Sequence, residues 1–344
     1  PETNKEFDVL GTMPDLPVGK IISERFEVGR AFCTKLWNAA RFALMNLGRH
    51  DSIPLSSADL RPEDRWILSR LSRIVRRVTE QLEAYNPSAA IGTAREFFWS
   101  EFCDWYLEFI KPRFKNDASA PAARTVLSYV LDRVLRLFNP FVPYITEVLW
   151  KRLNDQCPAR GLEKMSRAPD LLITASWPQP DKSLEDRAIE EDFGLIKNTV
   201  GAVRELRARY NIPPSKNVTA LIKADNPSAG ILNRHQDLIL HMGGISDLNI
   251  APDIERPATA ATAVVGDCEI YLEGLIDPDM EKTRLTKQRD KLLTELERAE
   301  SRLKNPNFVD RAPADVVEKE KAKLADIQGE ISLIEENLAH LNRE

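Results

Sequence analysis

The sequence predicts a mainly α protein: a helical bundle, followed by a small α/β unit and an antiparallel coiled-coil hairpin. Between residues 23 and 153, apolar residues recur at helical spacing over long stretches, and strand signals are nearly absent. After residue 190, helical and strand patterns alternate, and from residue 285 apolar residues repeat in heptads. This order of elements indicates an all-helical domain with two smaller units behind it.

The bundle is expected at residues 23–158, after a linker remnant at 1–22 that is rich in proline and glycine. Pro62 suits the first turn of a helix, whereas Pro140 and Pro143 should interrupt the last long helical stretch. The expected helices are 23–47, 62–85, 88–109 and 120–153.

A small α/β domain is expected at residues 191–275, after a mixed linker at 159–190. The helical pattern covers 191–210 and 234–243. Three segments have the alternation and composition of strands: "NVTALIKAD", "DLNIA" and "TAVVGDCEIYLEG".

A coiled-coil arm is expected at residues 276–344. One heptad series is Leu285, Arg289, Leu292, Leu296, Ala299 and Leu303, and the other is Val317, Glu320, Leu324, Ile327, Ile331, Ile334, Leu338 and Leu341. The loop "NPNFVDRAPAD" separates them, so the two series predict an antiparallel helical hairpin. The alternative is a pair of packed globular helices, but two arms of roughly 25 residues are longer than such helices usually are.

The composition argues against several classes of protein. The four cysteines, Cys33, Cys103, Cys157 and Cys268, have no ligand-like spacing, so we expect reduced thiols and no metal site. No apolar run reaches the roughly 20 residues of a membrane span, and no signal peptide is recognisable. We therefore expect a cytoplasmic protein.

The chain opens on Pro1 without a methionine, which suggests a piece of a longer polypeptide.

Positive charge is concentrated in two regions, although the net charge of the chain is −5. Residues 20–151 contain 20 basic and 15 acidic side chains, a net of +5, and residues 281–304 contain 8 and 5, a net of +3. Two basic regions on separate elements fit a long anionic partner. The alternative is that both are ordinary solvated helix faces.

The first helix contains the stretch "GRAFCTKLWNAARFALMNL", which holds a possible RNA-reading surface. Lys35 and Phe42 are seven residues apart and within about 20° on a helix, with Asn38 between them, while Arg30 and Arg41 share a second stripe. An exposed ring beside a cation and an amide suits unstacked bases of single-stranded RNA. The alternative is that the ring, like the nearby tryptophan, packs against a neighbouring helix. The expected core face is Cys33, Leu36, Ala40, Leu44 and Leu47.

Several motifs, taken together, resemble a known family. The opening helix, "DRWILSRL", "FFWSEFCDWYLEFIKPR" and "NPFVPYITEVLW" resemble, in the right order, the anticodon-binding domain of class I aminoacyl-tRNA synthetases. "ITASWPQPD" resembles the segment that leaves this bundle, and "KLLTELERAESRLKNPNFVDRAPADVVEKEKAKL" resembles the C-terminal coiled coil of valyl-tRNA synthetases. The isoleucyl and leucyl enzymes share the bundle motifs more loosely. The coiled coil, and the lack of a C-terminal cysteine cluster, favour the valyl family over an isoleucyl-type enzyme.

The resemblance implies a tRNA-recognising region of a valine–tRNA ligase that does not itself perform catalysis. The family's active site needs an HIGH-type motif and a KMSKS-type loop to hold ATP, and no HIGH occurs here. "KMSR" at residues 164–167 follows the bundle instead of preceding it, so we interpret it as accidental. This chain alone should be inactive and without a cofactor, because ATP, Mg²⁺ and editing against threonine belong to other parts of the enzyme. The implied partners are valine-accepting tRNA and the catalytic domain of the same enzyme, with neither DNA nor membrane, and the protein is expected to be a monomer.

The resemblance also implies contact residues. Lys35 and Phe42 lie where the family places a base-contacting cation and a stacking aromatic, and Asn38, Arg41 and Arg30 are further anticodon candidates. The coiled coil resembles an element that packs against the outer corner of the tRNA, where phosphates and 2′-hydroxyls are accessible. The candidates there are Lys282, Arg284, Lys287, Lys291, Arg298, Arg302 and Lys304. Arg289 lies on the heptad seam, where its stem can pack.

Another cluster looks functional but is interpreted as structural. Trp99, Asp104, Trp105 and Tyr106 lie close together in the sequence, and we expect an aspartate to satisfy the polar atom of a buried ring.

The rival function is a protein-interaction scaffold in which the hairpin binds partner helices. A scaffold should present apolar patches at the outer heptad positions, but these are mostly charged, as at Glu295, Glu297, Arg298 and Arg302.

Overall fold

The computed structural model describes residues 24–115, 118–213, 216–257, 260–273 and 278–304, and within the last part residues 324, 327–329, 331 and 334–335. The chain divides into two compact units between Phe193 and Gly194. The division falls inside one helix, α7 (Arg187–Arg209).

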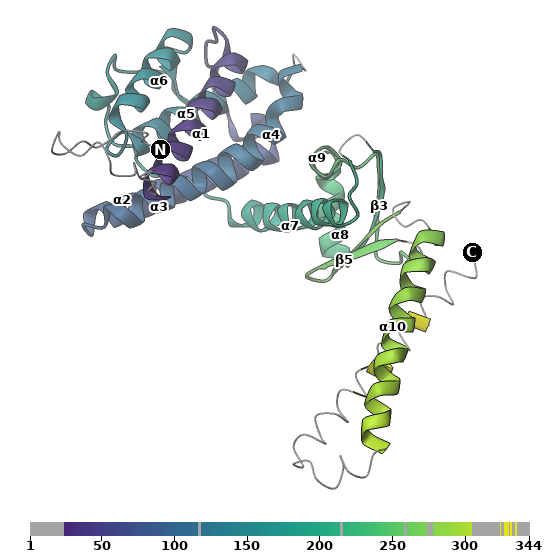
Figure 1. Ribbon diagram of the computed structural model, residues 1–344. Coiled ribbons are helices and arrows are strands. Elements are labelled where there is room, and N and C mark those ends of the chain that lie inside the picture. Colours follow the sequence, from purple (N-terminus) through teal and green to yellow (C-terminus); the bar gives the residue numbers. More distant parts are fainter. Residues whose placement is uncertain are drawn as a thin grey trace, which may run out of the picture. The chain divides into compact units, whose positions relative to one another are not determined.

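The first unit is a helical bundle, as the sequence predicts. The helices α1, α5 and α6 pack against one another, while α2 contacts α3 and α5 (Figure 1). Pro62 occupies the first turn of α2, and the turn that contains Pro140 separates α5 from α6. The bounds are α1 (Glu24–Leu47), α2 (Pro62–Glu83), α3 (Pro87–Glu96), α4 (Leu107–Ile110), α5 (Ala120–Phe138) and α6 (Pro143–Gln156).

The third expected helix, 88–109, is present, but its middle part is not an α-helix. Residues Phe97–Tyr106 form a π-helical segment between α3 and α4, and the N–H of Leu107 donates to the carbonyl of Phe102, five residues earlier. Such wide turns are rare and often occur at functional sites.

Aromatic rings fill the core of the bundle. Phe32 lies 4.8 Å from Phe138 and 6.2 Å from Phe98, centre to centre, in edge-to-face contacts. Trp66 stacks on Phe193 at 5.1 Å. All five rings are buried, and these distances are typical of stabilising aromatic pairs.

A buried ionic cluster ties the end of the long third helical stretch to the start of α2. Arg113 Nη1 lies 2.8 Å from Asp64 Oδ2 and 2.9 Å from Glu63 Oε1, and the Tyr106 hydroxyl donates to Asp64 Oδ1 at 3.1 Å. Burial raises the pKa of Glu63, and the carboxylate of Asp64 raises it further. The aspartate that satisfies the buried tyrosine is therefore Asp64 and not the neighbouring Asp104.

The segment at 159–190, interpreted from the sequence as a linker, is fastened to the bundle by side-chain contacts. Trp177 Nε1 donates to Thr79 Oγ1 at 2.8 Å, and Ser72 Oγ donates to the carbonyl of Asp181 at 2.8 Å. The segment also contains two short antiparallel strands, β1 (Ala159–Arg160) and β2 (Ser166–Arg167).

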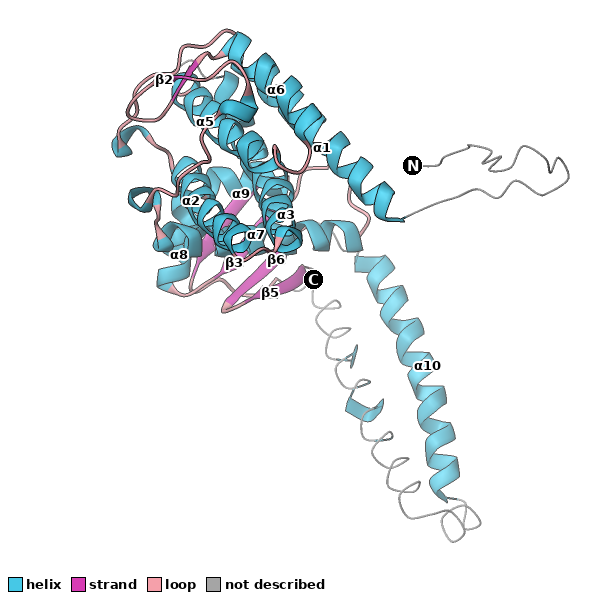
Figure 2. Cartoon of the chain, turned by 90° about the vertical axis from the view of Figure 1, so that its left-hand side faces the viewer, coloured by secondary structure: helices cyan, strands magenta, loops and turns pink. Residues whose placement is uncertain are grey.

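The second unit contains the predicted α/β arrangement. Its sheet has the order β4-β3-β6-β5, with β3 and β4 parallel and the other pairs antiparallel (Figure 2). Two helices connect the parallel strands, as parallel pairing requires a long crossover. The bounds are β3 (Thr219–Lys223), α8 (Asn226–Arg234), α9 (Gln236–Gly243), β4 (Asp247–Ala251), β5 (Ala261–Val265) and β6 (Cys268–Leu272).

Helix α8 was missing from the prediction, although its start signals were present. The Asp225 side chain accepts a hydrogen bond from the backbone N–H of Ser228, and a proline occupies the first turn.

The arm begins with the helix α10 (Pro278–Lys304). In the second heptad series, Ile327, Ile331 and Ile334 are helical and buried, at the spacing that the sequence predicts. The predicted loop between the two arms lies outside the described residues. Among the described helices, none is both long and apolar enough to cross a membrane.

Candidate nucleic-acid interface

Helix α1 presents one continuous exposed stripe. Thr34, Asn38, Arg41 and Met45 are exposed and follow one another at a spacing of three or four residues, and Met45 is 75% exposed. The opposite face is buried and consists of Phe32, Leu36, Ala39, Ala40, Ala43, Leu44 and Leu47. Two details differ from the expected core face: Cys33 is only half-buried, and Phe32 is a core residue that the periodicity did not select.

Lys35 flanks this stripe and is held by the π-helical segment. Its Nζ lies 2.9 Å from Asp104 Oδ1 and 5.0 Å from the centre of the Trp99 ring. The Lys35 side chain is about one third exposed and that of Asp104 nearly half, so the pair remains accessible to solvent. Neither partner can be inferred from the sequence of α1, because both lie more than 60 residues further along the chain.

Phe42 lies on the same flank as Lys35 and is half-buried. Lys111 Nζ lies 5.4 Å from the centre of its ring and pairs with Glu108 at 2.5 Å. The Phe42 ring is therefore neither fully exposed nor packed in the core. One part of it is covered by the Lys111 cation. Lys35 and Lys111 therefore each place an ammonium group over an aromatic ring on this flank, Lys35 over Trp99 and Lys111 over Phe42.

The other flank of the stripe is formed by Trp37, also half-buried. The Arg152 guanidinium lies 4.7 Å from the centre of its ring. A cavity of about 360 Å³ lies between α1 and α6, lined by Trp37, Arg41, Leu44, Met45, Leu149, Arg152, Asp155 and Gln156.

The remaining candidates on α1 differ in whether their side chains already have a polar partner. Arg30 is paired with Glu27 at 2.7 Å, one helical turn away. Asn38 and Arg41 are exposed, and within the described part of the chain neither makes a hydrogen bond or an ion pair. Their polar groups can meet a partner without first breaking a contact.

On the arm, Lys287 and Lys291 are exposed on α10. Arg289 is half-buried and pairs with Asp290 at 2.9 Å. The side chains of five further candidates lie outside the described residues: Lys282, Arg284, Arg298, Arg302 and Lys304.

The described residues form no recognisable metal site. In that part of the chain, no group of three or more His, Cys, Asp or Glu side chains could hold a metal ion. The "KMSR" segment at 164–167 ends in β2, the second strand of the small hairpin.

Two family models match separate stretches of the chain. Residues 64–222 match the family model of the anticodon-binding domain of tRNA ligases, and residues 277–342 match that of the valyl tRNA synthetase tRNA binding arm. The chain belongs to the valyl-tRNA synthetase family, as its C-terminal region. The resemblance drawn from the sequence motifs is thereby confirmed, and the predicted mainly α fold with a small α/β unit is consistent with it.

Full-length members of the valyl-tRNA synthetase family align with nearly the whole chain. Valine–tRNA ligase of Rhodopirellula baltica is 35% identical over 330 residues, which cover 95% of this chain and 32% of that enzyme. The valine–tRNA ligase of Geobacter sulfurreducens is 39% identical, covering 90% and 34%, and that of Thermotoga maritima is 36% identical, covering 94% and 35%. The chain thus spans about one third of the length of these curated relatives.

Proposed function

We propose that the chain is the tRNA-binding region of a valine–tRNA ligase and that its bundle, residues 23–158, contacts the anticodon through α1. The exposed stripe of α1 offers an exposed amide at Asn38 and an exposed cation at Arg41. Its flank offers the ammonium group of Lys35 and the half-buried ring of Phe42. A ring for stacking, an amide for a base edge and cations for phosphates are the groups that bind single-stranded RNA.

The arm, residues 276–344, binds the outer corner of the tRNA in this proposal. Lys287 and Lys291 are exposed one helical turn apart on α10, so both can reach the same stretch of RNA backbone. Double-stranded RNA presents mainly phosphates, 2′-hydroxyls and shape to a protein. The arm therefore contributes affinity that does not depend on base sequence.

In the whole enzyme, valine is joined to tRNA by a catalytic domain that uses ATP and Mg²⁺, and this domain is the chain's second partner. The chain itself holds no cofactor, binds neither DNA nor membranes, and acts as a monomer in the cytoplasm. It contributes affinity and tRNA identity, not the chemical step.

The observation that supports this proposal most strongly is that an accessible Lys35 and a half-buried Phe42 share one flank of a helix whose opposite face is core. The proposal is tested by titrating the chain with a valine-accepting tRNA and with the same tRNA carrying an altered anticodon, over a series of salt concentrations. We expect tighter binding of the native tRNA and a steep fall in affinity with salt. Absence of binding to both tRNAs at low salt would refute the proposal and favour the scaffold function.

A further inference from the structure

A polar cavity, separate from the one between α1 and α6, lies in the bundle unit, and none of its lining residues belongs to α1. Its volume is about 790 Å³, within the range of small-molecule binding sites. Its walls come from α5, from the turn and strands at 160–169, and from the chain at 174–184. The interface proposed above uses none of these residues.

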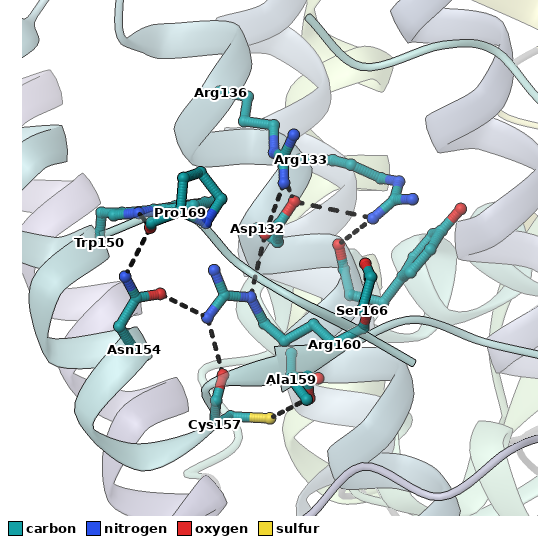
Figure 3. A network of polar contacts seen from close by, with 12 residues as sticks. Asp132, Arg133, Arg136, Trp150, Asn154, Cys157, Ala159, Arg160, Ser166 and Pro169 are labelled. Carbon is teal, nitrogen blue, oxygen red and sulfur yellow. Dashed lines mark hydrogen bonds and ion pairs between the residues drawn. The ribbon is translucent and has the colours of Figure 1, made fainter. Parts of the chain in front are cut away.

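Three arginines of the cavity share a single carboxylate. Arg136 Nε lies 2.8 Å from Asp132 Oδ1, Arg160 Nε lies 3.0 Å from Asp132 Oδ2, and Arg133 Nη1 is 3.7 Å from Asp132 Oδ1. Figure 3 shows the three guanidinium groups converging on Asp132 from different sides. One carboxylate cannot neutralise three guanidinium groups, so this cluster of four side chains carries a net positive charge.

Several contacts fix the Arg160 side chain, but one of its N–H groups has no acceptor among the described residues. Its Nη1 donates to Asn154 Oδ1 at 2.8 Å and to the carbonyl of Cys157 at 2.7 Å, and its guanidinium lies 4.4 Å from the Trp150 ring centre (Figure 3). The residue is only 4% exposed. Its Nη2 is buried and makes no hydrogen bond to any described residue. A buried donor of this kind is costly unless something accepts from it.

The Arg133 side chain makes long polar contacts with the Tyr129 carbonyl and the Asp132 carboxylate. Its guanidinium lies 3.2 Å from the ring centre of Tyr129, and the hydrogen bond that its Nη1 donates to the carbonyl of Tyr129 is long at 3.5 Å. Desolvation lowers the pKa of Arg133 and of Arg160, but a guanidinium stays charged in proteins. Both groups would therefore gain from an anion.

The rim of the cavity adds further basic and hydroxyl groups. A Cβ at Gly161 would lie 1.9 Å from the carbonyl oxygen of Lys164, so the tight turn that carries the "KMSR" segment into the rim requires glycine. Lys164, Arg167 and the Ser166 hydroxyl line the cavity beyond this turn. The basic lining residues are Arg133, Arg136, Arg160, Lys164 and Arg167 and the acidic ones are Asp132, Glu163 and Asp181, which gives 5 − 3, an excess of two positive charges.

We propose that this cavity binds a phosphate group, with Arg133 and Arg160 as the principal donors. Arginine presents a planar fork of N–H groups that matches phosphate oxygens in geometry as well as charge. The phosphate can belong to a phosphorylated small molecule or to an RNA backbone, and both sources share the same recognition chemistry. The site does not depend on the function proposed for α1.

The test is a calorimetric titration of the whole chain with inorganic pyrophosphate. Arg133→Gln should weaken binding at least tenfold, whereas Arg77→Gln, which removes an exposed arginine of α2 outside the cavity, should leave it unchanged. Arg167→Gln, at the exposed rim, should weaken binding several-fold without touching the Asp132 cluster, so it tests the site even if Arg133→Gln does not fold. The absence of pyrophosphate binding to the wild-type chain, or equal affinities of the wild-type, Arg167→Gln and Arg77→Gln chains, would overturn the proposal.

A competition experiment identifies the source of the phosphate. If tRNA displaces pyrophosphate, and Arg167→Gln weakens tRNA binding and lowers its salt slope by about one, the cavity takes an RNA phosphate. If pyrophosphate and tRNA bind together and Arg167→Gln affects pyrophosphate alone, the cavity takes a phosphorylated small molecule. Both results support a phosphate site, and the α1 proposal stands or falls separately.

Discussion

Lys35 Nζ lies 2.9 Å from Asp104 Oδ1, in an ion pair that joins α1 to the π-helical segment. The two residues are 69 positions apart in the chain. The pair places a carboxylate beside the cation that is proposed to meet RNA, so protein and RNA would compete for the same ammonium group.

Removing that carboxylate should therefore strengthen RNA binding. Asp104→Asn is expected to change the free energy of unfolding by less than about 1 kcal/mol, because partly exposed pairs contribute little. It should raise tRNA affinity several-fold at low salt, and Lys35→Met should lower it. The measurement is tRNA titration with thermal unfolding alongside. Weaker binding by Asp104→Asn would instead mean that the carboxylate positions Lys35.

The buried cluster of Asp64, Glu63 and Arg113 should dominate the stability of the bundle. Asp64→Ala leaves the Arg113 guanidinium buried with one carboxylate, and we expect a loss of about 3–5 kcal/mol in urea unfolding. Glu108→Ala removes the exposed partner of Lys111 and should cost less than about 1 kcal/mol. Similar losses in the two variants would contradict a structural role for the cluster.

His50 should make the bundle sensitive to mild acid. Burial lowers the pKa of His50, and the positive charge of Arg124 lowers it further. Because folding favours the neutral imidazole, its contribution is complete above the unfolded pKa of about 6.5 and is lost as pH falls through the lower folded pKa. As the pH falls from about 7 to about 5, the free energy of unfolding should therefore decrease less in His50→Gln than in the wild type. His241→Gln, at an exposed position, is the control, and identical pH profiles for His50→Gln and the wild type would exclude this coupling.

The exposed lysines of α10 should act as sequence-independent cations. Lys287→Gln and Lys291→Gln should each weaken tRNA binding equally for native and altered anticodons and lower the salt slope by about one. Lys223→Gln, on β3, is a matched control that should leave the slope unchanged. If either variant weakened binding only of the tRNA with the native anticodon, the contribution of the arm would depend on the RNA sequence.

The sequence predicted the elements that have strong local signals. Helices α1 and α2 follow from apolar spacing and from a proline at the start of α2, and the buried Ile327, Ile331 and Ile334 follow from the heptad. Helix α8 could have been found from its aspartate cap.

Features that depend on long-range contacts could not be found in the sequence. At 100° per residue Phe32 and Cys33 both border the core face of α1, and the surrounding rings of Phe98 and Phe138 decide which one is buried. The π-helical turn and the partners of Lys35 are tertiary features of the same kind. For the candidate site, the sequence could select Lys35 and Phe42, but not the groups that hold them.

The flank of α1 that carries Lys35 and Phe42 is proposed to read the anticodon. The most direct test compares the affinity of the chain for native and anticodon-altered tRNA, in the wild type, in Phe42→Ala and in Tyr144→Ala. Tyr144 is 89% exposed on α6 and serves as the matched aromatic control. We expect Phe42→Ala to cost about 1–3 kcal/mol of binding free energy with the native tRNA and to abolish discrimination, while Tyr144→Ala preserves it. Full discrimination by Phe42→Ala would contradict the claim.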